Sequence, residues 1–209
     1  METSVPDIYA AGDAVQVKHY VTGNDALISL AGPANKQGRI IADNICGGDS
    51  RYLGSQGSSV IKVFDMIAAT TGINETNAKK SGLEVDTVIL SPMSHAGYYP
   101  GGKVMTMKVV FEKDTYRLLG AQIIGYEGVD KRIDVLATAI HAGLNATQLK
   151  DLDLAYAPPY SSAKDPVNMA GFMIDNIAKG TLKQWHLEDI YLLYTSPSPR
   201  DRSLSRMPS

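Results

Sequence analysis

The sequence predicts an α+β fold in which helices gather around three or four antiparallel strands. Three observations carry this prediction. The stretch KVMTMKVVFEKDTYRLLGAQIIG at 103–125 has two apolar, β-branched runs around the turn residues Lys113–Thr115, which is typical of a β-hairpin. Asp130 to Gly143 then carries apolar residues at helical spacing. Val167 to Ala178 predicts a last helix.

The first element in chain order is a short apolar run from Ile8 to Ala11, which follows an extended Val5–Pro6 segment. Such a run is typical of a strand buried on both faces. It stops at Gly12 and Asp13. Ligands of open α/β sheets lie beyond the carboxyl ends of the strands, so Asp13 is placed to accept a hydrogen bond from a ligand hydroxyl. An ordinary strand followed by a Gly-Asp turn is the alternative.

A helix is predicted within DALISLAGPANKQGRIIADNICGG at 25–48, because Pro33 suits a first helical position and isoleucines recur at helical spacing until paired glycines end the pattern. Its N-terminus lies near the Leu30–Ala34 backbone, where free amides and the helix dipole stabilise a carbonyl or an anion. A plain amphipathic helix is the alternative. Cys46, near its end, is expected to be a small buried filler.

Residues 54–180 are predicted to fold around their own core. Ser59–Thr71 is strand-like, Glu75–Ser81 predicts a short helix and Leu83–Leu90 another strand, all before the hairpin. The apolar face predicted for the helix that follows consists of Ile133, Leu136, Ala137, Ile140 and Leu144.

Composition indicates an ordinary globular protein. The hydrophobic fraction is 44% and the net charge is -2, so a core is available and no basic excess indicates nucleic-acid binding. We find no apolar run of about 18 residues and no signal peptide, which predicts a cytoplasmic protein without a membrane partner. The single cysteine cannot form an internal disulfide, and we predict no metal site.

One motif resembles a phosphate loop, but we reject that interpretation. GYYPGGKV at 97–104 matches G-x-x-x-x-G-K, but Val104 stands where Ser or Thr is needed for magnesium. The residues after it alternate like a strand, whereas a phosphate loop must open a helix. We therefore do not expect nucleoside triphosphate binding.

Tyrosines are the candidate chemical groups. SHAGYYPGG contains Tyr98 and Tyr99, and LAYAPPYSSAKDPVNMAGF contains Tyr156 and Tyr160. A phenol can donate a hydrogen bond to a thiolate while its ring shields the site from water, which suits a pocket that handles sulfur. Tyrosines that only cover a core edge are the alternative. Asp165–Pro166 reads as an N-cap followed by proline at the first helical position.

A strand ending in Ala-Gly-Asp, followed by a helix entered through LAGPANKQGR, resembles the last FAD-binding segments of the flavoprotein disulfide reductases. The resemblance implies that Asp13, after Gly12, holds the ribitol chain of FAD. It also implies that the amides of Leu30 and Ala31, in the helix entry that extends to Ala34, face the pyrimidine edge of the flavin.

The same resemblance implies a domain organisation. Residues 1–53 would be the end of an FAD-binding Rossmann-like domain, 54–180 the α+β dimerisation domain, and 181–190 a linker to a rhodanese domain. This family begins with a glycine-rich unit for the ADP half of FAD, yet no G-x-G-x-x-G follows a predicted strand. We therefore expect an upstream reading frame, with Met1 an internal methionine.

The segment AYAPPYSSAKDPVNMAG at 155–171 resembles one branch, the CoA-disulfide reductases, with NADH oxidases and peroxidases as near relatives. The branch implies a homodimer in which Tyr98, with Tyr99 as its alternative, and Tyr156 act as catalytic groups at the CoA–cysteine pair of the partner subunit. The parent enzyme would use FAD, NAD(P)H and CoA to reduce CoA disulfide, CoA persulfide or polysulfide. Alone, the chain is expected to be inactive and to retain no flavin.

Two alternatives remain open at this point. The parent could be an NADH oxidase or peroxidase, whose cysteine cycles through a sulfenic acid and needs no CoA. The chain could also be a non-enzymatic dimerisation module that acts by itself.

The last residues carry a different signal. Residues 191–209 are rich in Ser, Pro and Arg without periodicity, which predicts disorder. LLYTSPSPRD resembles the translation of a transposase adapter used in sequencing libraries, and SRMPS that of the index-side flowcell adapter. We interpret this segment as an artefact outside the natural protein.

Overall fold

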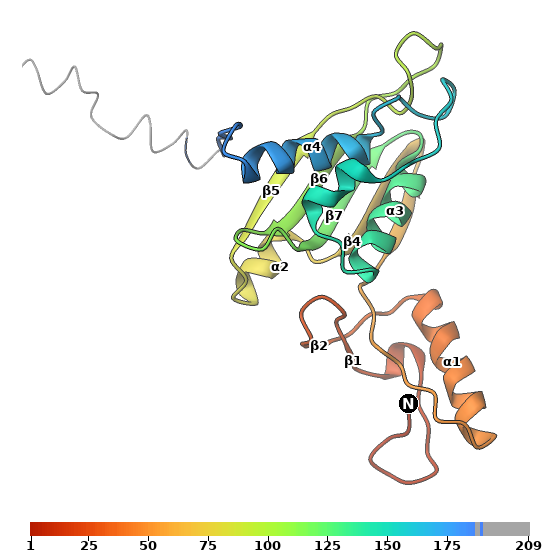
Figure 1. Ribbon diagram of the computed structural model, residues 1–209. Coiled ribbons are helices and arrows are strands. Elements are labelled where there is room, and N and C mark those ends of the chain that lie inside the picture. The colour runs from red at the N-terminus through yellow and green to blue at the C-terminus, as the bar shows by residue number, and fades with distance from the viewer. Residues whose placement is uncertain (187–188, 190–209) are drawn as a thin grey trace, which may run out of the picture. The chain divides into compact units, whose positions relative to one another are not determined.

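A computed structural model describes residues 1–186 and 189 (Figure 1). The predicted artefact at 191–209 lies outside these residues, as does part of the predicted linker at 181–190. Met1–Asp175 form one compact unit, and a second unit begins at Asn176. The domain boundaries at residues 53 and 180 stay predictions. No helix among the described residues is both long and apolar enough to cross a membrane.

The N-terminal segment contains one long helix and very short strands. Its elements are the 3-10 helix η1 (Gly12–Ala14), strands β1 (Val17–Lys18) and β2 (Asp25–Ala26), which pair antiparallel, and helix α1 (Ala31–Ile45). Helix α1 confirms the predicted helix, with Leu30 as its N-cap. The prediction of a buried Cys46 is wrong, because the side chain is exposed beyond the end of α1. The neighbouring Ile45 is 66% exposed, so no core covers this end within the described residues.

The strand predicted at Ile8–Ala11 is also wrong. This segment makes an isolated antiparallel bridge between Glu2 and Tyr9, and Ile8 is exposed. A strand buried on both faces needs a neighbour along each edge. Within the described residues the run has only the Glu2 segment beside it, so it stays a loop that leads into η1.

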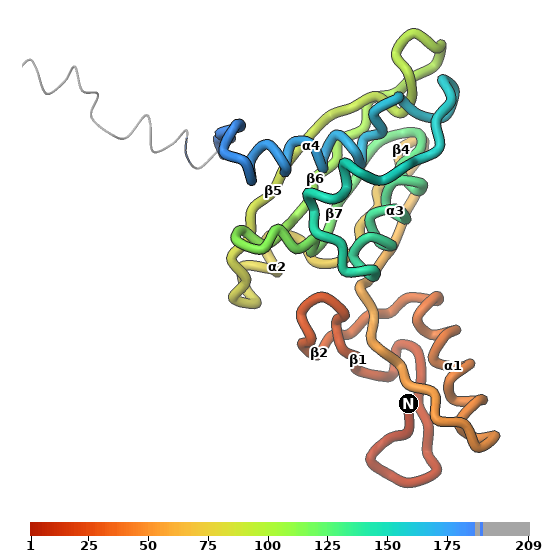
Figure 2. Tube along the Cα trace, in the orientation of Figure 1, coloured from red at the N-terminus to blue at the C-terminus, as the bar shows by residue number. Residues whose placement is uncertain are grey.

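In the part of the chain that follows α1, a five-stranded antiparallel sheet in the order β3-β4-β7-β6-β5 forms the centre (Figures 1 and 2). Its strands are β3 (Ser59–Val63), β4 (Met66–Gly72), β5 (Val85–Leu90), β6 (Thr106–Glu112) and β7 (Leu118–Gly125). The predicted hairpin at 103–125 is confirmed as β6 and β7. The expected count of three or four strands is wrong, because the stretch predicted as one strand at Ser59–Thr71 folds back at Phe64 and Asp65 into two.

One face of the sheet carries the core. The helices are α2 (Glu75–Lys80), α3 (Val129–His141) and α4 (Pro166–Ala178), with the 3-10 helix η2 (Ala146–Asp151) between the last two. Helices α3 and α4 lie across the same face, as Figure 1 shows. The buried residues of α3 include Ile133, Leu136 and Ile140 of the predicted apolar face, whereas Ala137 and Leu144 are half-buried.

The opposite face of the sheet is only partly covered. Alternate residues of β3, β5 and β7 leave Ile61 (60% exposed), Ile89 (57%) and Ile124 (44%) open. They line a shallow apolar groove of about 460 Å³ together with Lys108 and Gln122. A contiguous apolar surface of this kind marks an interaction site more often than an isolated exposed side chain does.

Helix α4 is held against η2 at a glycine. A Cβ added at Gly171 would lie 2.2 Å from the backbone nitrogen of Lys150, so no side chain fits. We expect Gly171→Ala to lower the free energy of unfolding by about 1–3 kcal/mol or more, because backbone must move apart. Gly38→Ala is the matched control, since Gly38 in α1 has nothing within 4 Å of that position. Chemical denaturation measures the free energy of unfolding of both variants. Equal changes in Gly171→Ala and Gly38→Ala would contradict the close packing of α4.

Candidate functional site

Two loops carry the candidate tyrosines. The first, at 94–103, is closed at its base because Ser94 N donates to Lys103 O (2.7 Å) and Lys103 N donates to Ser94 Oγ (3.0 Å). The second, at 152–165, connects η2 to α4. No helix follows the first loop, since the next regular element is strand β6. The rejection of a phosphate loop is therefore confirmed.

The structure brings Tyr98 and Tyr156 together from positions 58 residues apart. Their hydroxyl oxygens are 2.8 Å apart, a hydrogen bond in which either oxygen can donate. Tyr98 is 76% exposed and Tyr156 47%, so both phenols face outward. Hydrogen bonding to Tyr98, with a smaller contribution from partial burial, raises the pKa of Tyr156. Whichever phenol accepts this bond keeps its own O–H proton, so the pair offers one proton to an external acceptor.

The other two tyrosines are placed differently. Tyr99 packs edge-on against the buried ring of His95, with ring centroids 5.6 Å apart, and does not join the pair. Tyr160 is exposed at the rim of a cavity of about 570 Å³, whose wall also includes Tyr156, Lys131 and Glu127. Of the two adjacent tyrosines, Tyr98 is thus the one that meets Tyr156.

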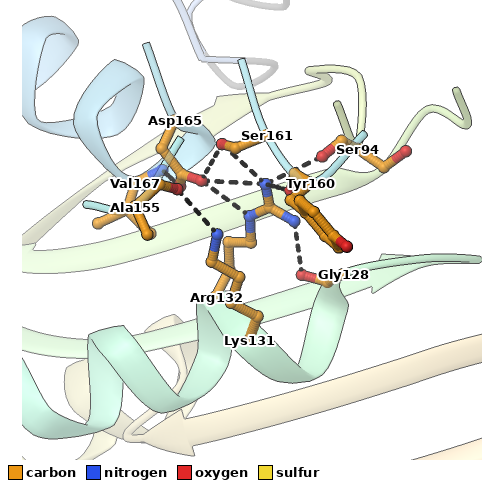
Figure 3. Close-up of polar contacts among 9 residues, drawn as sticks. All are labelled: Ser94, Gly128, Lys131, Arg132, Ala155, Tyr160, Ser161, Asp165 and Val167. Carbon is orange, nitrogen blue, oxygen red and sulfur yellow. Dashed lines mark hydrogen bonds and ion pairs between the residues drawn. The ribbon is translucent and has the colours of Figure 1, made fainter. Parts of the chain in front are cut away.

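Arg132, which forms part of the wall of this cavity, belongs to a buried ion pair (Figure 3). Arg132 of α3 and Asp165 at the start of α4 are 1% and 3% exposed, and Arg132 Nη2 lies 3.0 Å from Asp165 Oδ2. Asp165 Oδ1 also accepts a hydrogen bond from Val167 N (3.0 Å), which confirms the predicted N-cap. Arg132 is absent from the residues predicted from the sequence. Its burial could be expected from its position, because Arg132 lies next to Ile133 and one turn before Leu136, on the face that an amphipathic helix buries.

A second group of predicted residues meets where η1 packs on α1. Gly12 N donates to Oε1 of the buried Gln37 (2.7 Å). A Cβ on Gly12 would lie 3.7 Å from that of Ala34, so this glycine and the first turns of α1 are neighbours. Asp13 is exposed in η1. The structure therefore places η1, which carries the exposed Asp13, against the first turns of α1.

The amides at that helix start are not equivalent. Leu30 N donates to Ile28 O (3.1 Å), whereas Ala31 opens α1, and the first amides of a helix lack an intrahelical acceptor. Among the described residues no group of three His, Cys, Asp or Glu side chains is arranged to hold a metal ion. Carboxylate and amide groups together suit a ligand that offers hydroxyls and a carbonyl.

Residues 58–166 match the family described as the pyridine nucleotide-disulphide oxidoreductase dimerisation domain. The chain belongs to this family. The match confirms the predicted fold class, and a dimerisation domain implies association of two chains. Members of the family are FAD-dependent and use NAD(P)H.

Particular relatives lie in the branch predicted from the sequence. The CoA-dependent NAD(P)H sulfur oxidoreductase of Pyrococcus abyssi is 39% identical over 167 residues, which cover 80% of this chain and 37% of that protein. The coenzyme A disulfide reductase of Staphylococcus epidermidis is 37% identical over 172 residues, which cover 82% of this chain and 39% of that protein. The chain thus spans less than two fifths of these relatives.

A solved structure is also similar. The crystal structure of reduced Bacillus anthracis CoADR-RHD matches with a TM-score of 0.87 at 49% sequence identity. The match covers 90% of this chain and 34% of that one. It includes far more of the chain than the dimerisation domain alone.

Proposed function

We propose that this chain is part of a cytoplasmic, NAD(P)H-dependent flavoprotein that reduces CoA disulfide, CoA persulfide or polysulfide. The observation that carries the proposal is the hydrogen bond between the exposed hydroxyls of Tyr98 and Tyr156. Reductive cleavage of a disulfide or persulfide releases a sulfur anion. A protonated phenol pair with one free O–H is a donor for that anion, and its rings exclude water from the sulfur.

The residues at η1 and α1 fit the role of one wall of an FAD site. Asp13 would accept hydrogen bonds from the ribitol hydroxyls, with Gly12 and Ala34 keeping η1 close to α1. The amide of Ala31, with that of Leu30 beside it, would face the flavin pyrimidine edge, where the positive end of the helix dipole favours partial negative charge. When bound, FAD supplies electron transfer between the pyridine nucleotide and the sulfur substrate.

We also infer that the open sheet face meets a second copy of the chain, which would make the homodimer. Ile124→Glu should shift the chain toward monomer, because it places a charge within an apolar contact. Ile45→Glu is the matched control: Ile45 is equally apolar and more exposed, but lies on α1. Sedimentation velocity measures the proportion of monomer and dimer in both variants. An Ile124→Glu chain that dimerises as well as the Ile45→Glu chain would place the contact elsewhere.

A hybrid enzyme tests the proposed activity. Residues 3–190 of this chain would replace the matching part of the Staphylococcus epidermidis relative, and flavin content and NAD(P)H oxidation would be measured. We expect a flavin-loaded hybrid that consumes NAD(P)H when CoA disulfide or polysulfide is added. A flavin-loaded hybrid that consumes NAD(P)H with oxygen or peroxide but not with these sulfur substrates would support the oxidase or peroxidase alternative instead.

A further inference from the structure

Arg132 touches both loops that carry the paired tyrosines. Its Nη2 donates to the carbonyl oxygen of Ser94 (2.9 Å), at the base of the 94–103 loop. The same nitrogen also lies within hydrogen-bond distance of the carbonyl oxygen of Tyr160 (3.3 Å) and of Ser161 Oγ (3.2 Å), near the end of the 152–165 loop, and its two hydrogens are shared among these acceptors. Figure 3 shows these contacts converging on one guanidinium. One side chain of α3 therefore joins two loops that are distant in sequence.

The guanidinium is itself fixed in place. Asp165 Oδ2 accepts from Arg132 Nε (3.1 Å) and Nη2 (3.0 Å), and also from Ser161 Oγ (2.6 Å). Arg132 Nη1 donates to Gly128 O (3.1 Å) at the N-terminus of α3. Charge-assisted bonds of a planar guanidinium are strong and directional, and both partners are shielded from water. The cluster of Arg132, Asp165 and Ser161 therefore fixes the positions of the two loops to which Arg132 is bonded.

The two loops are also joined directly beside Arg132. Ala96 N donates to Ser161 O (2.9 Å), two residues before Tyr98. In contrast, the Tyr98–Tyr156 hydrogen bond is solvent-exposed, and an exposed bond between neutral groups is too weak to hold two loops by itself. The separation of the phenols therefore depends on what fixes the loop bases.

We propose that Arg132, held by Asp165 and Ser161, is a positioning residue that keeps the hydroxyls of Tyr98 and Tyr156 within hydrogen-bond distance. The role rests on the proposed function in so far as the pair acts on substrate sulfur. Arginine is required because its planar fork serves the carboxylate and the loop carbonyls at once, whereas lysine is a point charge without that fork. Arg132 is 1% exposed and acts through the loop atoms that it bonds.

The test is a pH titration of the full chain with tyrosine labelled at the ring Cζ carbon for NMR, in which Tyr98→Phe and Tyr156→Phe assign the signals. The variants are Arg132→Lys and Ser161→Ala. The matched control is Thr71→Val, because Thr71 is equally buried and its Oγ1 bonds Ser58 Oγ (2.7 Å) away from both loops. Thermal melts of every variant report the loss of stability separately.

We expect the raised pKa of Tyr156 to fall back toward that of free tyrosine in Arg132→Lys and Ser161→Ala, and to stay raised in Thr71→Val. Hydrogen exchange at the Ala96 amide should become about tenfold faster in the first two variants alone. Variants that melt at a lower temperature but keep the raised pKa of Tyr156 would overturn the proposal, since Arg132 would then be structural only. Ser161→Ala provides this answer if Arg132→Lys does not fold.

The proposal and the proposed function fail in different measurements. The titration follows the phenol pair without CoA or flavin, so its outcome does not depend on the reaction. If Arg132 controls the pair but the tyrosines are dispensable for turnover in the hybrid enzyme, only the proposed function fails. If the tyrosines are required but the pair is unchanged in Arg132→Lys and Ser161→Ala, only the positioning role fails.

Discussion

Changing both Tyr98 and Tyr156 to Phe in the hybrid enzyme should lower turnover with CoA disulfide by roughly 10- to 1000-fold, the range for removing hydrogen bonds to a developing anion. The rings remain, so packing of the two loops is retained. The single variants should each lose less than the double variant, because the remaining phenol still has an O–H proton but lacks the hydrogen-bonded partner that orients it.

Steady-state kinetics with CoA disulfide measures this effect. Tyr99→Phe is the matched control, since Tyr99 neighbours Tyr98 in sequence but packs on His95. A double variant that turns over at the parent rate would identify the tyrosines as packing residues. Single losses that simply multiply in the double variant would contradict their action as a pair.

The second large effect concerns the buried ion pair. Arg132→Met leaves the carboxylate of Asp165 buried without its partner, which costs about 3–5 kcal/mol of stability in comparable sites. Adding Asp165→Asn should recover part of this loss, because asparagine removes the charge yet still caps α4 through its side-chain oxygen. Urea unfolding of the parent, both single variants and the double variant completes the cycle. Strictly additive losses would show that Arg132 and Asp165 are not coupled.

Strong local periodicity explains what could be predicted from the sequence. The 103–125 hairpin has Lys113 and Asp114 between two β-branched runs, and α3 repeats apolar residues every three or four positions. Each signal lies within one short window. The turn between β3 and β4 was not predicted, because Phe64 and Asp65 include no Gly, Asn or Pro. In the structure Phe64 nevertheless adopts a positive φ of 52°.

Interactions between distant parts of the chain explain what could not be predicted. The burial expected at Ile8–Ala11 depends on neighbouring strands, which a local pattern cannot supply. Arg132 and Asp165 are separated by 33 residues, so their pairing follows from the packing of α3 against the start of α4. The family resemblance already favoured Tyr98 over Tyr99, but the hydrogen bond between the hydroxyls of Tyr98 and Tyr156 required coordinates.

The most direct test of the central claim separates the two half-reactions of the hybrid enzyme by rapid mixing. With Tyr98→Phe/Tyr156→Phe, we predict that NAD(P)H reduces the flavin at the parent rate while the subsequent step with CoA disulfide is slowed by roughly 10- to 1000-fold. This split follows because the phenols meet the departing sulfur and not the nicotinamide. An unchanged disulfide step, or an equal slowing of both steps, would contradict the assignment of this pair to sulfur chemistry.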